Sequence, residues 1–183
     1  MKQTKKITLS AMSIALGVLF MTLGAFIEVL DLTSSALCSC LMAFVFIEIG
    51  AKYAIAVWLG TSILGFVFFP HSLVWVTFLL VFGIFPILKA FIERTKRQFW
   101  IPLKLVYFAF SGALLILVSE LLLGIPFFGD TLNIPLFENN MGLFKALVCI
   151  LLLCAMFVYD VFMTMMIRTY FTAIRKRIQS LLK

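Results

Sequence analysis

The stretch that decides the fold covers residues 81–104, VFGIFPILKAFIERTKRQFWIPLK. An apolar run that contains Pro86 and Lys89 leads into a strongly basic loop that begins after Glu93. Apolar segments lie on both sides of this loop along the chain. If those segments cross a membrane, the side on which the loop lies determines the side of every other loop.

The composition indicates an integral membrane protein. Of the 183 residues, 64% are hydrophobic and 13% are charged. Soluble domains are about half apolar and about one quarter charged, so this chain could not cover its surface with polar groups in water. The net charge of +7 therefore reflects membrane topology, because lysine and arginine collect on the cytoplasmic side. It gives no reason to expect a nucleic-acid partner.

Six apolar segments are long enough, or nearly so, to cross a bilayer, which takes about 20 residues. The first follows a basic start but is too long for the apolar core of a signal peptide, which has roughly 7–15 residues. An amphipathic cytoplasmic tail is expected at residues 168–183, and the whole chain is expected to form a single domain. The predicted helices cover residues 7–27, 35–50, 53–69, 73–92, 101–123 and 143–167.

The charges of the loops agree with six crossings. If the amino terminus is cytoplasmic, every one of the 15 lysines and arginines except Lys145 falls on the cytoplasmic side. The opposite turns hold acidic residues instead, among them Glu28 and Asp31. The positive-inside rule is then met at every loop. The predicted fold is an all-α integral membrane protein with six transmembrane helices, in the cell membrane, with both termini cytoplasmic.

Three charged residues fall inside apolar segments, namely Glu48, Lys89 and Asp160. Charges at such depth are costly and tend to be paired or to line a polar cavity. The interpretation we favour is a structural ion pair of Lys89 with Glu48 or Asp160, clamping the second, fourth and sixth segments. A proton relay through the carboxylates is the alternative.

Polar and aromatic residues gather at the outer ends of the segments. If segments four to six pack together, these groups converge around an outward-facing ligand pocket. Otherwise they form an ordinary solvated rim. The candidate ligand-binding residues are Glu28, His71, Trp75, Glu120, Asn139, Asn140 and Lys145.

No motif for catalysis, nucleotide binding or metal binding is present. The sequence holds no HExxH, GxSxG or P-loop pattern. A single histidine, His71, leaves little for acid–base chemistry. We therefore expect no enzymatic activity, no metal and no cofactor, and a partner would have to hydrolyse ATP for any energised process.

Small residues recur at helical spacing in the first segment, as Ala11 with Ala15 and Ser13 with Gly17. Such spacing lets two helices approach closely in lipid, either inside this protein or against a partner. The opening KKITLSAMSIALGVL resembles that of the substrate-binding S components of energy-coupling factor (ECF) transporters, although Leu19 stands where a third small residue is expected. The segment FGIFPILKAFIERTK is also similar to one in small uncharacterised bacterial multi-pass membrane proteins.

The ECF resemblance implies a six-helix subunit that binds a vitamin-like micronutrient at its outer side. It also implies that Ala11 and Ala15 contact the transmembrane coupling subunit, while an ATPase pair supplies energy. No ligand motif carries over, so the ligand stays unidentified. Two alternatives remain open: a non-catalytic structural or assembly protein of the cell envelope, and an enzyme or ion-coupled carrier that uses Glu48 and Asp160.

Overall fold

The computed structural model describes residues 3–27, 30–122, 124 and 141–174. Within these residues the chain is entirely helical, and six segments are long and apolar enough to cross a membrane. The predicted all-helical fold with six such helices is thus confirmed for this part of the chain. The elements are α1 Gln3–Phe26, α2 Asp31–Glu48, α3 Ala51–Phe68, α4 Leu73–Thr77, η2 Phe78–Phe82, α5 Phe85–Ile92, η3 Arg97–Phe99, α6 Trp100–Leu122, α7 Met141–Thr169 and η4 Tyr170–Ile174.

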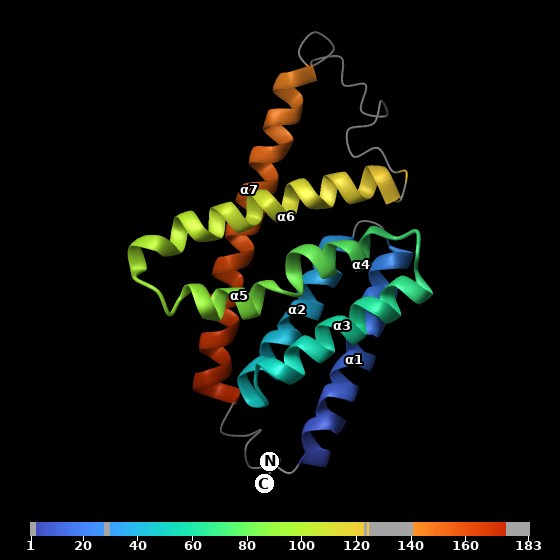
Figure 1. Cartoon of the computed structure of the whole chain (residues 1–183), viewed down its shortest axis with the longest axis vertical. Coiled ribbons are helices and arrows are strands. Elements are labelled where there is room, and N and C mark those ends of the chain that lie inside the picture. Colours follow the sequence, from blue (N-terminus) through green and yellow to red (C-terminus); the bar gives the residue numbers. More distant parts are fainter. Residues whose placement is uncertain (1–2, 28–29, 123, 125–140, 175–183) are drawn as a thin grey trace.

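The helices α1, α2 and α3 pack against one another, and α6 crosses α7 (Figure 1). Gly17 allows the close approach of α1 to α3, since a Cβ at this position would lie 2.9 Å from Cγ2 of Thr61. The first turn of α1 and the last turns of α7 lie toward the same end of the molecule (Figure 1). An even number of crossings has this consequence.

The helix α2 begins earlier than predicted. The predicted helix began at residue 35, whereas the helix already starts at Asp31. The serines are accommodated because they face neighbouring helices: Ser34 is buried against Gly24, and the Ser35 hydroxyl donates to the carbonyl of Val74 at 3.1 Å. Serine at a helix interface in lipid can satisfy its hydroxyl in this way.

The fourth span is not one continuous helix. It consists of α4, the five-residue π-helix η2 and α5, with Gly83 and Ile84 between the last two. The amide of Gly83 donates to the carbonyl of Phe78 at 2.7 Å, which closes the wide π turn. Pro86 stands in the first turn of α5, where its missing N–H is tolerated. The helix is therefore interrupted just before Pro86, and the interruption lies in the most buried of the six spans.

Side chains from two neighbouring helices bond the carbonyls at this interruption. The indole Nε1 of Trp58 donates to the carbonyl of Leu79 at 3.2 Å. The hydroxyl of Tyr107 lies 3.2 Å from the carbonyl of Leu80 and 2.7 Å from that of Val81. Because hydrocarbon offers no water to backbone groups, a broken span is stable only when neighbours supply such bonds. Here α3 and α6 supply them.

The aromatic ring of Phe85 lies at the centre of the core, where α5, α6 and α7 meet. Its centroid is 5.0 Å from that of Phe108, 5.9 Å from that of Tyr107 and 5.4 Å from that of Tyr159. The hydroxyl of Tyr159 is also hydrogen-bonded to Ser39 of α2. This cluster therefore connects α7 both to the broken span and to α2.

Candidate functional site

A cavity of about 610 Å³ lies where the α1–α2 connection meets the α3–α4 turn. Its size is that of a typical small-molecule site, which is about 300–1,000 Å³. One carboxylate, one imidazole and one hydroxyl contribute polar groups, and an aromatic ring and three small or aliphatic side chains complete the wall. The lining residues are Ala25, Asp31, Phe69, Pro70, His71, Ser72 and Leu73.

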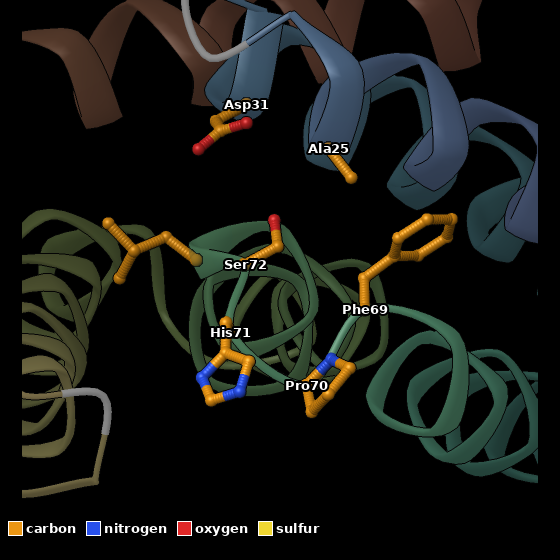
Figure 2. A pocket seen from close by; sticks show the side chains of 7 residues that line it. Ala25, Asp31, Phe69, Pro70, His71 and Ser72 are labelled. Atoms are coloured by element: carbon orange, nitrogen blue, oxygen red, sulfur yellow. The ribbon is translucent and has the colours of Figure 1, made fainter.

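The side chains of Asp31 and Ser72 point into the gap from opposite sides (Figure 2). The ring of Phe69 extends toward the side of Ala25, away from Ser72, and the imidazole of His71 points away from Asp31 (Figure 2). His71 is exposed, whereas Asp31 and Ser72 are half-buried. A solute between the two faces would therefore meet the carboxylate and the hydroxyl first.

The wall formed by the α3–α4 turn is held from within the protein. The Ser72 hydroxyl accepts the amide of Val74 at 3.3 Å and so caps α4. The indole Nε1 of Trp75 donates to the carbonyl of Pro70 at 3.2 Å, and its ring packs edge-on against Phe66 with centroids 5.0 Å apart. The turn is thus fixed by a cap and by a buried tryptophan.

The structure brings together only part of the predicted ligand set. His71 lines the cavity, whereas Trp75 is 8% exposed and supports the wall from behind. Glu120 is exposed on α6 and does not line the cavity. Three predicted residues and the side chain of a fourth lie outside the described part of the chain, namely Glu28, Asn139, Asn140 and Lys145.

The sequence did not single out Phe69 or Ser72, and it placed Asp31 only in a general outer set. It also expected the pocket between the fourth, fifth and sixth spans, whereas this cavity lies between the first two connections on that side. The available signal for this cavity was that two short polar turns, one next to Asp31 and one around His71, were predicted on the same side. Which turns meet depends on helix packing, and periodicity does not reveal it.

A second polar group lies at the other end of the fourth span, where two lysines and two carboxylates form a closed ring of ion pairs. Lys89 pairs with Asp160, and its Nζ is 3.4 Å from Glu93 and 2.6 Å from the hydroxyl of Thr164. Nζ of Lys104 is 2.7 Å from Asp160 and 3.3 Å from Glu93. The formal charges cancel, which buried charges require.

This four-residue charge cluster ties α5, α6 and α7 together. Lys89 is 1% exposed and Lys104 is 6% exposed. The sequence analysis expected no partner for Glu93 or for Lys104, so it missed half of the cluster. The spacing of Lys89 and Glu93, four residues apart on a helix, was the available signal.

Glu48, the third intramembrane charge, lies elsewhere. Its carboxylate accepts a hydrogen bond of 2.8 Å from the hydroxyl of Tyr170, whose ring packs edge-on against Phe44. The contact therefore joins α2 to the end of the sixth span. The structure thus pairs Lys89 with Asp160 and not with Glu48. The charge cluster joins the fourth, fifth and sixth spans, whereas the sequence predicted a clamp of the second, fourth and sixth.

The two pairs of small residues on α1 point in different directions. Ser13 and Gly17 are buried, while Ala11 and Ala15 are exposed. The first pair serves packing inside this protein. The second pair forms an uncovered face on which another helix could approach closely.

The chemistry available at the cavity is that of binding. It offers an ionic contact, a hydrogen bond and an aromatic surface, and the residues that the structure describes contain no group of three His, Cys, Asp or Glu side chains suited to a metal ion. Comparison of the chain with family models, with curated proteins and with solved structures finds no match.

Proposed function

We propose that this protein is a membrane-embedded solute-binding subunit of an ECF-type transporter. It takes up a small, vitamin-like organic micronutrient, and a partner ATPase module supplies the energy. The chain spans the cell membrane six times with both termini in the cytoplasm.

The observation that carries this proposal is the cavity lined by Asp31, Phe69 and Ser72. Its volume of about 610 Å³ suits a small organic molecule, and it combines a few polar groups with an apolar wall, as ligand sites do. It lies at the start of α4, whereas the charge cluster lies around the end of α5. Binding and cytoplasmic contacts would thus be separated along the fourth span.

The orientation follows from the distribution of charge. Lys52, Arg94 and Arg168 all lie on connections or helix ends away from the cavity. Since basic residues mark the cytoplasmic side, the cavity would open outward. An uptake protein needs its binding site on that side.

The exposed Ala11 and Ala15 supply the surface for the coupling subunit. Two helices in lipid associate mainly through close packing, for which alanine is well suited. A bulky residue there should weaken association while leaving the fold intact, because neither side chain is buried.

Two measurements on the full chain test the proposal. The first is co-purification with a coupling subunit and ATPase pair, comparing the unaltered chain with Ala15→Leu and with a control, Ala109→Leu, which makes the same change at an exposed position on α6. The second is the melting temperature in detergent with a panel of vitamins and related solutes. Loss of the module in Ala15→Leu alone, together with a solute that raises the melting temperature, is the expected result.

A chain that neither associates with such a module nor responds to any small organic solute would contradict the proposal. The alternative is then the structural or assembly protein of the cell envelope. One feature favours that alternative: the charge cluster fastens the last three spans rigidly, as a scaffold requires. It predicts a stable protein partner that binds without any solute.

A further inference from the structure

We propose that the connection between α5 and α6 is a binding surface for the headgroup of an anionic phospholipid. The surface, which we call the basic turn, consists of the cations Arg94, Lys96 and Arg97 and the exposed rings of Phe91 and Phe99. The inference goes beyond the proposed function and does not rest on it. It needs only that the spans on either side of the turn cross a bilayer.

The positive charges of the basic turn are uncompensated. Arg94, Lys96 and Arg97 form no ion pair with an acidic residue that the structure describes. The acidic neighbour of Arg94 in the chain, Glu93, is already 3.4 Å from Nζ of Lys89 and 3.3 Å from Nζ of Lys104. Because the charge cluster is neutral in itself, the turn attracts a negative group from outside the chain.

The basic turn lies at the level expected for lipid phosphates. The apolar span before the turn ends at Ile92, and the next span starts at Arg97. All three cations are exposed, and the connection lies at one edge of the molecule (Figure 1). An anionic bilayer surface attracts a nearby lysine or arginine with a free energy that corresponds to about a fivefold gain in affinity. Three such side chains on one turn therefore favour an anionic lipid over a neutral one.

Hydrogen bonds fix the shape of the basic turn before any lipid binds. The amide of Phe99 donates to the carbonyl of Lys96 at 2.9 Å. The indole Nε1 of Trp100 donates to the carbonyl of Thr95 at 3.0 Å. The backbone that carries the cations is thus held in place, so binding would cost little ordering of the chain.

The exposed rings favour a lipid over a free phosphate ion. Phe91 and Phe99 flank the three cations along the chain, and both are exposed. The guanidinium of Arg94 lies 5.6 Å from the ring centroid of Phe91. Segments that lie at a bilayer surface combine basic residues with aromatic ones in this way, because the phosphate meets the cations and the acyl chains contact the rings. A free phosphate ion would leave the rings in water.

The experiment measures lipid binding to the purified full chain by native mass spectrometry in a neutral detergent. The probes are dioleoylphosphatidylglycerol, dioleoylphosphatidylcholine and inorganic phosphate. We expect the chain to retain phosphatidylglycerol in preference to phosphatidylcholine, and we expect inorganic phosphate not to displace it.

Two double variants of equal charge locate the binding. Lys96→Gln/Arg97→Gln should weaken the apparent affinity for phosphatidylglycerol roughly 25-fold, at about fivefold for each residue. The matched control, Lys52→Gln/Arg168→Gln, removes one exposed lysine and one exposed arginine from other elements and should keep the first retained lipid. The exchange Lys96→Arg/Arg97→Lys preserves the charge and should bind as the unaltered chain does.

Equal retention of phosphatidylcholine, or phosphatidylglycerol binding that survives in Lys96→Gln/Arg97→Gln, overturns the inference. Equal losses in the two double variants also overturn it, because binding would then follow the total charge. Displacement of the lipid by inorganic phosphate would indicate a site for a free anion, and retention of an acidic protein in place of lipid would indicate a protein surface; either result overturns the inference as well. If the double variant does not fold, Arg97→Gln replaces it, with an expected loss of about fivefold.

Discussion

Replacing Lys89 by methionine tests whether the charge cluster stabilises the fold. Methionine has a similar length and keeps the aliphatic part, but it removes the ammonium group from Asp160, Glu93 and Thr164. The cluster would then hold two carboxylates against one lysine. Asp160, whose side chain is 14% exposed, would have only Lys104 to balance its charge.

The expected loss follows from the burial of the group. Removing one partner of a buried ion pair costs about 3–5 kcal/mol, and the low end applies here because Lys104 still contacts Asp160 at 2.7 Å. For a chain of this size about 3 kcal/mol corresponds to a fall in melting temperature of about 6–12 °C. The measurement is thermal unfolding in detergent, with the folded yield as a second readout.

The matched control is Lys52→Met, which makes the same change at an exposed lysine and should shift stability by less than about 0.5 kcal/mol. The double variant Lys89→Met/Asp160→Asn restores neutrality, since Lys104 and Glu93 remain. It should therefore be more stable than the sum of the two single changes by about 1–3 kcal/mol. An unchanged melting temperature in Lys89→Met, or a coupling below about 0.5 kcal/mol, would refute the reasoning.

Two further predictions concern the broken fourth span. Tyr107→Phe removes the hydroxyl that donates to two carbonyls of the break. We expect it to lower the free energy of unfolding by about 1–3 kcal/mol, measured as a lower melting temperature. An unchanged melting temperature would mean that these carbonyls do not need the bond. Gly83→Ala would place a methyl 2.3 Å from the ring of Trp58, so the folded yield should fall severalfold. Gly112→Ala, where a Cβ meets no atom within 4 Å, is its control, and equal yields would contradict the packing at Gly83.

The sequence was sufficient to predict the number and type of the helices. Long apolar segments separated by polar turns have few other solutions, since a lipid-facing backbone must satisfy its own hydrogen bonds. The boundaries were less certain. The second helix was predicted to begin only at residue 35, because serine favours turns and caps, but helix contacts stabilise Ser34 and Ser35 inside α2.

The sequence could not predict which polar groups meet in space. Lys89 was recognised as a residue in need of a counter-ion, yet Lys104 was counted only as one of the basic residues on the cytoplasmic side. The position of the cavity could not be predicted for the same reason. Asp31 and Ser72 are far apart along the chain, and only the packing of α1 and α2 against the α3–α4 turn brings them to one gap.

The long separation between the partners of the charge cluster has a consequence for biosynthesis. Lys89 precedes Asp160 by 71 residues, and Tyr107 follows Val81 by 26 residues. Because synthesis proceeds from the amino terminus, the fourth span leaves the ribosome before Asp160 and Tyr107 exist, and Glu93 is then the one member of the charge cluster beside Lys89. In a bilayer Lys89 would then extend toward the lipid headgroups, as long basic side chains do, until the last span arrives. Insertion of α7 would therefore be the step that draws Lys89 inward, and a chain terminated ahead of Asp160 would keep this lysine at the bilayer surface.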